Sequence, residues 1–468
     1  MLHIIPLPKF RPPIDPDFVP ASLWSRAYRA ALSKSGREQP LAIALERTDG
    51  SVSVFRASVF PHEDPWIAAN EIFVERLVKF LLWQRGGYKV TIAGDSRIGD
   101  FIRAVYSPSG RRSFDYRFMG EQVYGLPMAI EQTTYENAPA EKESTAELGR
   151  HLEGCRIGFD LGGSDRKCAA VIDGEVVHSE EVVWDPYFKT DPQYHFDGIN
   201  DTLARAAAHL PRVDAIGGSA AGVYVNNEVR VASLFRGVPK DLFDTRIRRL
   251  FYELEAAWNG IPFVVVNDGE VTALAGSMAL DDNAVLGVSM GTSQAGGYVT
   301  PQGAITNWLN ELAFVPVDYR ERGPVDEWSG DTGVGSQYFS QQAVNRLLPA
   351  AGIELPKDMP LAEKLAEAQK LTNAGDGGGR RIFESIGTYF GYAIAHYADF
   401  YDLRHMLVLG RVMSGEAGDV ILSTARAVLA GEFPELAERI QLHVPSEKEK
   451  RHGQAVAAAS LPRIATRP

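Results

Sequence analysis

The chain is poor in cysteine: its 468 residues include only Cys155 and Cys168. Two cysteines give neither a disulfide framework nor a cysteine zinc cluster, and we expect both to be buried, reduced thiols. No uninterrupted apolar run approaches the roughly 20 residues of a membrane-spanning helix. Residues 1–20 also lack the apolar core of a signal peptide. The sequence therefore favours a cytoplasmic protein with no membrane partner.

An excess of positive charge is also missing. The formal net charge is −12, and residues 1–150 hold 19 basic and 18 acidic residues. A nucleic-acid-binding surface needs a basic face. We therefore expect no nucleic-acid partner. The ordinary proportions of hydrophobic residues (45%) and charged residues (23%) are typical of a globular protein with two to four domains or lobes.

One loop carries groups suited to binding phosphate. The apolar run Ile157–Phe159 ends in Asp160, and Gly162-Gly163-Ser164 precedes a second apolar run. Glycine lets a backbone approach a phosphate closely, and successive N–H groups form an anion-binding concavity. A carboxylate at a strand end can orient the hydrated Mg²⁺ of a nucleotide. An ordinary Gly-Gly hairpin is the alternative.

Two further motifs follow in order. The buried-type strand Val264–Val266 ends in Asn267-Asp268, and an Ala-rich helix comes next. Another apolar strand, at 284–289, leads into a second small-residue loop, Gly291-Thr292-Ser293. Two Gly/Ser/Thr hairpins thus flank an aspartate at a strand end.

The order and spacing of these motifs resemble those of the ROK sugar kinases, in the superfamily of actin, Hsp70 and sugar kinases. The resemblance continues through a long helix at 382–398, a strand at 406–409 that ends at Gly410, and an Ala-rich tail at 453–459. It covers about residues 151–462. It implies an α/β protein with the two-lobed actin-like ATPase (ribonuclease H-like) fold, here with an extra N-terminal α/β domain.

The resemblance also implies residue roles. Asp268 would be the catalytic base that accepts the proton of a sugar hydroxyl, although a helix N-cap is the alternative for an aspartate at this place. Asn267 and Glu311 would bind the substrate. Asp160 would hold Mg²⁺ through water. The phosphates and the nucleotide would contact Gly162, Gly163, Ser164, Gly291, Thr292, Ser293 and Gly410.

Several positions depart from the family pattern. Phe314 stands where a histidine is usual, and no cysteines follow it, so we expect no structural zinc. A loop rich in Asp, Arg and Trp, at 316–335, occupies that region. The family's sugar-contacting segment is replaced by residues 232–237. Glu270 is unusual at its position, and we expect it only to complement the helix dipole. Lys167 matches no fixed family position, and it either reaches a phosphate or is solvated.

The sequence suggests three parts. Residues 1–147 form an accessory α/β domain, 148–283 a first kinase lobe, and 284–468 a second lobe with the C-terminal helix. In the accessory domain we expect two strands around Thr48-Asp49-Gly50, an amphipathic helix at 66–83, and a strand at 88–93. The same order of elements in 156–218 raises the hypothesis of a degenerate repeat, with an unrelated accessory domain as the alternative.

The leading hypothesis is therefore an ATP- and Mg²⁺-dependent carbohydrate kinase with a small-molecule sugar substrate. A homodimer is compatible with it. One alternative is a catalytically weak nucleotide- or sugar-binding protein of the same fold, and another is a kinase for a non-hexose acceptor. A ROK-type repressor does not fit the balanced charge and strand-rich pattern of the first 150 residues. We expect those residues to pack near the acceptor side of the cleft and to supply its missing contacts.

Overall fold

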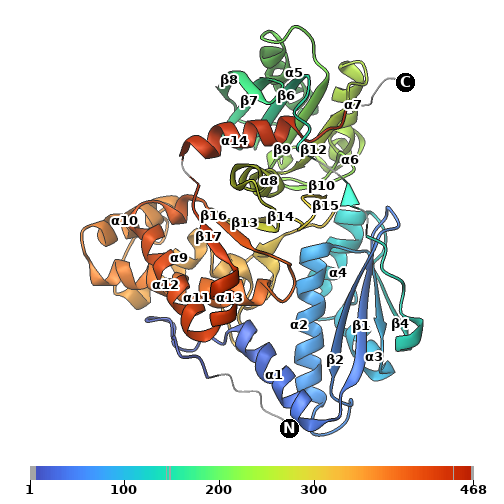
Figure 1. Ribbon diagram of the computed structural model, residues 1–468, viewed down its shortest axis with the longest axis vertical. Helices are drawn as coiled ribbons and strands as arrows, with labels where there is room; N and C mark the ends of the chain where they lie inside the picture. The colour runs from blue at the N-terminus through green and yellow to red at the C-terminus, as the bar shows by residue number, and fades with distance from the viewer. Residues whose placement is uncertain (1–6, 144, 147–148, 446, 465–468) are drawn as a thin grey trace.

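Three β-sheets of four to six strands, a separate two-stranded sheet and the surrounding helices make up the part of the chain that the structure describes (Figure 1). The computed structural model describes residues 7–143, 145–146, 149–445 and 447–464. The upper part in Figure 1 is lobe I, and the lower left part is lobe II. The N-terminal unit lies beside lobe II. None of the helices in the described ranges is long and apolar enough to cross a bilayer.

The N-terminal unit is a four-stranded sheet with strand order β2-β1-β3-β4, covered by helices. Its elements are α1 (Ala21–Ser35), β1 (Gln39–Glu46), β2 (Val52–Val59), α2 (Ile67–Arg85), β3 (Lys89–Ala93), α3 (Ser96–Val105), α4 (Ser113–Arg117), the π-helix η1 (Phe118–Tyr124) and β4 (Ala129–Thr133). The expected hairpin, helix and strand are thus present. Helix α2 is buried on nearly all sides, because it lies between this sheet and lobe II (Figure 1).

Lobe I is built on a five-stranded sheet with strand order β12-β9-β6-β7-β8. Its strands are β6 (Cys155–Leu161), β7 (Asp165–Ile172), β8 (Glu175–Val183), β9 (Ala215–Ala220) and β12 (Phe263–Asn267). Its helices are α5 (Pro192–Ala207), α6 (Lys240–Thr245) and α7 (Leu250–Ala257), and a separate hairpin joins β10 (Val223–Val225) to β11 (Glu228–Val231). Strands β6, β9 and β12 run parallel, so their carboxyl ends meet at one edge.

Strand direction separates this sheet from the N-terminal one. Strands β6 and β9 pair parallel, whereas the strands at the corresponding places, β1 and β3, pair antiparallel. The two units share the order of elements and an antiparallel first pair of strands, but not the direction of the strand that follows the helix. The strand directions therefore do not support the hypothesis of an internal repeat.

Lobe II contains a six-stranded sheet with strand order β17-β16-β13-β14-β15-β5. Its strands are β5 (Thr145–Ala146), β13 (Val285–Met290), β14 (Gln294–Val299), β15 (Ile305–Thr306), β16 (His405–Leu409) and β17 (Gln441–His443). Helices α9 (Gln341–Ala351), α10 (Leu361–Asn373), α11 (Gly377–Tyr397), α12 (Glu416–Glu432) and α13 (Pro434–Arg439) cover it. The long helix expected near 382–398 is α11.

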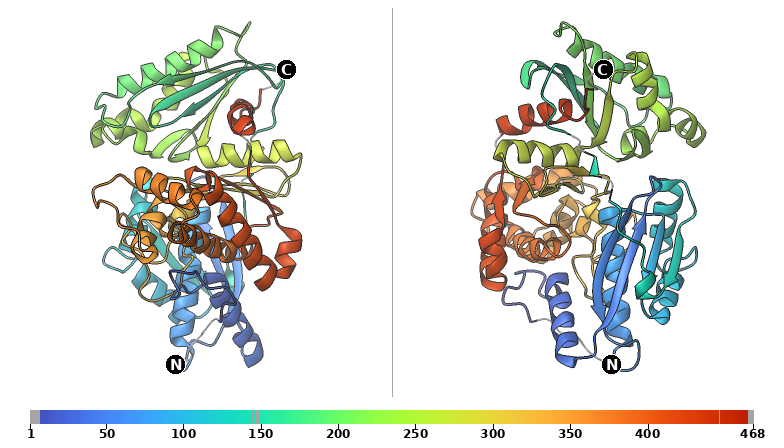
Figure 2. Two further views of the ribbon diagram at one scale, coloured as in Figure 1. Left: turned by 90° about the vertical axis from the view of Figure 1, so that its left-hand side faces the viewer. Right: turned by 45° about the vertical axis from the view of Figure 1, so that its right-hand side comes forward.

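Two helices link the lobes. Helix α8 (Asp268–Leu280) runs across the junction, and the C-terminal helix α14 (Glu447–Ala459) returns to lobe I, as both views in Figure 2 show. A Cβ atom at Gly217 would lie 1.9 Å from the carbonyl oxygen of Ala458, so α14 rests directly on β9. The sequence analysis assigned this C-terminal helix to lobe II. Strand β5, at 145–146, pairs with β15 of lobe II. The expected boundaries at 147 and 283 stay predictions.

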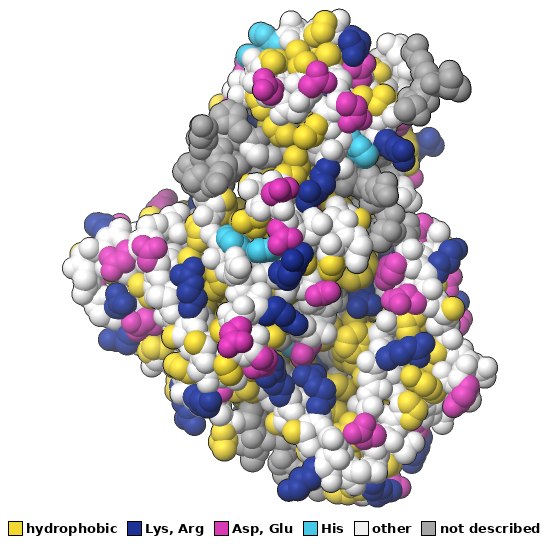
Figure 3. Space-filling model, in the orientation of Figure 1, with side chains coloured by type: hydrophobic (Ala, Val, Ile, Leu, Met, Phe, Trp, Pro, Cys, Tyr) yellow, Lys and Arg dark blue, Asp and Glu magenta, His cyan; other side chains and the backbone are white. Residues whose placement is uncertain are grey.

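Acidic and basic side chains are interspersed over the face of the molecule in Figure 3. This pattern matches the balanced charge of residues 1–150. Most exposed ion pairs contribute less than about 1 kcal/mol to the free energy of unfolding. The ion pairs that matter for the arrangement of the parts are the buried ones.

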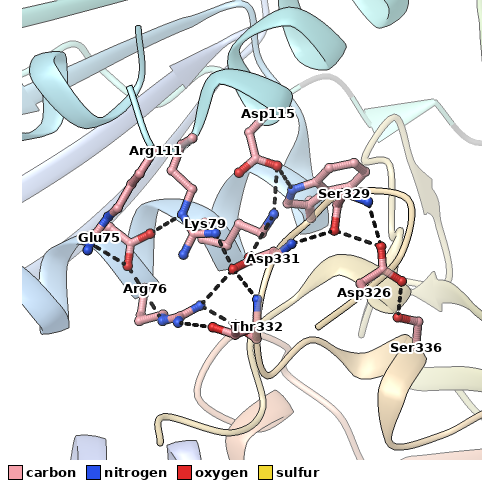
Figure 4. Close-up of polar contacts among 12 residues, drawn as sticks. Glu75, Arg76, Lys79, Arg111, Asp115, Asp326, Ser329, Asp331, Thr332 and Ser336 are labelled. Atoms are coloured by element: carbon pink, nitrogen blue, oxygen red, sulfur yellow. Dashed lines mark hydrogen bonds and ion pairs between the residues drawn. The ribbon is translucent and has the colours of Figure 1, made fainter. Parts of the chain in front are cut away.

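A buried ion cluster joins the N-terminal unit to lobe II (Figure 4). Lys79 of α2 is fully buried, and its Nζ lies 2.7 Å from Asp115 Oδ1 and 3.2 Å from Asp331 Oδ2. Arg112 pairs with both Glu75 and Asp331. Burial alone raises the pKa of Asp331, but the surrounding cations, Lys79 first, hold that pKa well below its usual range. Asp331 therefore remains ionised and binds the loop of lobe II to α2.

The N-terminal arm is anchored in the same manner. Asp15 accepts hydrogen bonds from Arg320 at 2.6 and 2.9 Å, from Arg346 at 2.8 Å and from the Tyr389 hydroxyl at 2.6 Å. Burial raises the pKa of Asp15, but these partners outweigh it and lower the pKa to about 2. The arm is thus an integral part of lobe II.

The Lys79→Met variant tests the ion cluster. Removing this cation leaves the Asp115 and Asp331 carboxylates buried near each other, which costs about 3–5 kcal/mol in the free energy of unfolding. We expect a clearly lower urea midpoint for the first unfolding transition. The matched control is Lys370→Met, because Lys370 is exposed and pairs only with Glu367, so we expect a change below about 1 kcal/mol. Equal effects of the two variants would contradict the anchoring role.

Candidate functional site

The first hairpin places Asp160 beside a glycine turn. Strands β6 and β7 pair antiparallel, with Asp160 opposite Lys167, and residues 162–164 form the tip. Gly162 N–H donates to the carbonyl oxygen of Asp165 at 2.9 Å. The N–H groups of Gly163 and Ser164 donate to no group among the described residues. Free N–H groups at a turn tip are suited to binding an anion.

A tyrosine covers this turn. The Tyr187 hydroxyl lies so close to Gly163 that a Cβ atom at this position would displace the tyrosine ring. The Arg236 guanidinium lies 4.1 Å from the Tyr187 ring centroid. Sequence reasoning placed Arg236 in the rebuilt segment but assigned it no role. Lys167 Nζ lies 3.1 Å from Asp165 and 3.6 Å from Asp160, so it is paired rather than merely solvated.

Asp268 is the first residue of α8, at the carboxyl end of β12. The N-cap of this helix is Asn267, whose Oδ1 accepts from Gly269 N–H at 2.7 Å. Asp268 Oδ1 accepts from the same N–H at 3.0 Å, so the two side chains share this donor while Asn267 holds the N-cap position. Burial, and then the charge of nearby Asp160, raise the pKa of Asp268 to about 6. Asp160 is held by the Ser219 hydroxyl at 2.7 Å.

Glu311 is the third carboxyl group at this place. Burial, and then the charge of Asp268, raise its pKa to about 7. Its carboxylate has no polar partner among the described residues. Its backbone N–H donates to the carbonyl oxygen of Trp83 at 3.0 Å, and that of Asn310 donates to Gln84 at 2.9 Å. The last turn of α2 therefore positions the loop that carries Glu311.

Glu270 occupies a different environment from the one its sequence position indicated. It does not lie on the helix surface; it is buried, and it accepts from Asn310 Nδ2 at 2.6 Å and from Tyr298 N–H at 3.4 Å. Asn310 in turn accepts from the Tyr401 hydroxyl at 2.8 Å. Burial raises the pKa of Glu270 to about 8. At neutral pH the side chain is thus mainly an uncharged carboxylic acid.

The second hairpin joins β13 to β14 through residues 291–293. Gly291 N–H donates to the Ser293 carbonyl oxygen at 2.9 Å, while Thr292 and Ser293 donate to no group among the described residues. Gly410 lies beside the end of β13: its φ is 104°, and a Cβ atom there would lie 2.3 Å from the Met290 carbonyl oxygen. Gly410 and the second hairpin thus form one group in lobe II.

Close contact between backbones connects the two halves of the site. A Cβ atom at Gly269 would lie 2.2 Å from the carbonyl oxygen of Gly296 in β14. The first turn of α8 therefore rests directly on the second hairpin. The structure brings Asp160, Asp268 and Glu311 together. It places the second hairpin and Gly410 across the junction in lobe II.

A cavity of about 410 Å³ is lined in part by Asn267, the residue next to Asp268. Lobe I contributes the β10–β11 hairpin and β12, lobe II contributes residues 305–309, and the N-terminal unit contributes residues 47–49 and Tyr124. Sequence reasoning read Thr48-Asp49-Gly50 as a turn only. No sequence pattern marks Tyr124 as a lining residue.

The described residues contain no group of three or more His, Cys, Asp or Glu side chains arranged to hold a metal ion. Hydrogen bonds and ion pairs hold the loop at 316–335. Asp326 accepts from Ser329 N–H, from the Ser329 hydroxyl and from the Ser336 hydroxyl, each at 2.8 Å (Figure 4).

No protein-family model matches the chain, and no curated protein matches its sequence. Solved structures do match. The ROK hexokinase from Thermus thermophilus matches with a TM-score of 0.52 and 20% identity, over 65% of this chain and 97% of the hexokinase. A ROK family transcriptional regulator, a homologue of the E. coli MLC protein, matches with a TM-score of 0.53 and 17% identity, over 84% of this chain and 96% of the regulator.

At these identities the comparisons show the fold. The chain has the two-lobed, actin-like α/β fold of the ROK proteins, and the predicted fold class is confirmed. Because the fold occurs in both a kinase and a regulator, activity must be argued from the site.

The buried carboxyl groups predict a distinct pH dependence of stability. Glu270 has a folded pKa of about 8 and an unfolded pKa of about 4.3. Between these values the folded state holds a proton that the unfolded state releases, so this group makes the protein less stable as pH rises. Glu270→Gln removes this contribution. We expect the variant's thermal midpoint to fall less than that of the wild type between pH 5 and pH 8.

The exposed Glu121→Gln variant provides the control, because it changes the same side-chain type without removing a buried acid. Its thermal midpoint should follow the wild-type curve at every pH. If Glu270→Gln also follows that curve, the buried carboxyl group does not hold a proton in the folded state.

Proposed function

We propose that the protein transfers the terminal phosphoryl group of ATP to a hydroxyl group of a carbohydrate. The observation that supports this most is the environment of Asp268. Its carboxylate lies beside Asp160 and Glu311, accepts from Gly269 N–H at 3.0 Å, and has a pKa of about 6. A general base works best when its pKa is near the operating pH.

In this reaction the substrates are the sugar and ATP with its Mg²⁺. Asp268 accepts the proton of the sugar hydroxyl while the hydroxyl oxygen bonds to the γ-phosphorus. The bond from that phosphorus to the bridging oxygen breaks, and ADP leaves. Asp160 holds the hydrated Mg²⁺ through water. Phosphoryl transfer depends mainly on such positioning and on neutralised charge.

The hairpin tips supply the phosphate contacts. Gly163 and Ser164 in lobe I, and Thr292 and Ser293 in lobe II, have N–H groups without a partner among the described residues. Glycine turns from opposite lobes thus offer donors to the nucleotide phosphates. Gly410, beside the second hairpin, borders the nucleotide on that side. Asn267 and Glu311 hold the sugar.

The Asp268→Asn variant tests the base. Asparagine keeps the shape but cannot accept the proton, so we expect turnover to fall by about 10²–10⁴-fold while ATP binding persists. ADP release measured across a panel of sugars gives the rate, and calorimetry with ATP gives binding. The control is Asp281→Asn, at the exposed C-terminal end of the same helix, which should keep wild-type turnover. A variant at Asp268 with more than a tenth of wild-type turnover would assign the base elsewhere.

The pKa of Asp268 also predicts the acid limb of the rate profile. The base must be deprotonated, so kcat/KM should fall about tenfold per pH unit below pH 6, because this parameter reports groups of the free enzyme. A steady-state profile from pH 5 to pH 8 measures it. An acid limb that begins near pH 4 would mean that Asp268 is not held in the environment described above.

A further inference from the structure

The cavity beside Asp268 is bounded by parts of the molecule that lie far apart in sequence. Its walls come from both lobes and from the N-terminal unit, at the junction where β10 and β15 lie in Figure 1. Tyr224 links the cavity to the site. It lines the cavity, and burial, followed by the charge of Asp268, raises the pKa of its hydroxyl. The cavity therefore opens next to the proposed base.

Arg47, Asp49 and Glu270 line the cavity, and each is bonded within the protein; Glu270 accepts from Asn310 Nδ2 and from Tyr298 N–H. Arg47 donates to the hydroxyls of Ser51 and Ser53, each at 2.8 Å, and to Glu143 at 2.7 Å. Asp49 accepts from Ser51 N–H at 2.9 Å and from Asn307 Nδ2 at 2.6 Å. The cavity thus presents no uncompensated cation among its described lining residues. An anionic ligand such as a sugar phosphate finds no counter-charge there.

The remaining lining is suited to a neutral ligand with both hydroxyl groups and apolar faces. The Tyr124 hydroxyl has no hydrogen-bond partner among the described residues, although the side chain is 4% exposed. Asn267 Nδ2 donates one amide hydrogen to the Gly222 carbonyl oxygen at 2.7 Å, and its second amide hydrogen is available to a ligand. Apolar surface comes from Val223, Val225, Val265, Ile305 and Leu309. Sugar rings combine these two kinds of surface.

The volume matters as well. Cavities of roughly 300–1,000 Å³ hold ligands of drug size, and this one, at about 410 Å³, lies within that range. The reacting ring must reach the carboxyl groups of Asp268 and Glu311, neither of which lines the cavity. Space for a further ring of the same molecule is thus available beside the reacting one.

We propose that this cavity binds the second ring of the acceptor, so that the protein phosphorylates a neutral disaccharide in preference to a free monosaccharide. The inference rests on the proposed function. The N-terminal unit then determines specificity: Tyr124 donates a hydrogen bond to the second ring, and the Asp49–Asn307 contact closes the wall around it. The reacting hydroxyl belongs to the ring at Asp268.

The first experiment compares acceptors. ADP release is measured with glucose, galactose, mannose and fructose, and with maltose, cellobiose, lactose, melibiose, sucrose and trehalose. At least one disaccharide should exceed every monosaccharide in kcat/KM by about tenfold or more. If the best monosaccharide equals or exceeds all disaccharides, the inference is overturned while the proposed function stands.

Variants locate the second ring. Val225→Tyr fills the cavity from β10, and it should reduce the ratio of disaccharide to monosaccharide kcat/KM at least tenfold. Val177→Tyr is the matched control, because it makes the same change on a strand of lobe I where Val177 is 50% exposed. Tyr124→Phe removes one hydroxyl and should raise KM for the disaccharide about 3- to 10-fold with kcat little changed. An unchanged ratio in Val225→Tyr overturns the inference.

Calorimetry separates this inference from the proposed function. The Asp268→Asn variant should bind the preferred disaccharide without ATP, and Val225→Tyr in that background should weaken the binding at least tenfold. If no sugar is phosphorylated by the wild type, the proposed function fails. In that event the same ten sugars are titrated directly: a disaccharide bound through Tyr124 and Val225 supports the binding site, and absence of disaccharide binding overturns it.

Discussion

Two backbone hydrogen bonds join the end of α2 to the loop that carries Glu311, and the geometry of the site depends on them. The carbonyl oxygens of Trp83 and Gln84 belong to the last turn of a helix, where no intrahelical donor remains for them. Here the N–H groups of Glu311 and Asn310 satisfy both, at 3.0 and 2.9 Å. The loop adopts a left-handed conformation at Asn310 to do so, with φ of 50°. The N-terminal unit is therefore part of the site's scaffold.

Two sets of carboxyl groups show opposite behaviour. Asp15, Glu75 and Asp331 are surrounded by arginine and lysine, and their pKa values are lowered. Asp268 and Glu311 lack such cations, and their pKa values are raised. The first set stabilises the fold above the unfolded pKa near 4 and loses this effect in acid. The second set makes the protein less stable as pH rises. The carboxyl groups of Asp15, Glu75 and Asp331, which hold parts of the fold together, are thus paired with cations. Those of Asp268 and Glu311, to which we assign roles in the reaction, have no cation beside them among the described residues.

Local motifs account for what the sequence predicted well. A strand, a glycine turn and a second strand are encoded within a few residues, so the hairpin at 162–164 and the Asn267-Asp268 strand end could be placed from sequence. Strand direction could not: β1 and β3 run antiparallel, although the order of elements suggested a repeat of lobe I. Glu270 was also misjudged, because its partner Asn310 lies 40 residues away. Contacts of that kind have no local signal.

The position of Lys79 in the sequence already indicates a buried ion pair. Lys79 stands within the apolar run of α2, next to Val78 and Phe80, where a solvated lysine does not fit. A charged residue in such a place requires a buried partner from elsewhere in the chain, and Asp115 and Asp331 supply it. The cavity residues Asp49 and Tyr124 carried no comparable signal, because a turn aspartate and a buried tyrosine are common in any α/β unit.

The environment of Phe314 is formed in part by the N-terminal unit. The Phe314 ring lies 4.4 Å from that of Trp83 and 5.1 Å from that of Trp328, measured between centroids. A histidine among these rings would bury a polar nitrogen, at a cost of about 1–3 kcal/mol without a partner. Once α2 covers this position, an aromatic hydrocarbon is the better residue. Asp326 and Asp331 hold the loop at 316–335 through hydrogen bonds from Ser329 and Ser336 and through ion pairs to Lys79 of α2 and to Arg112.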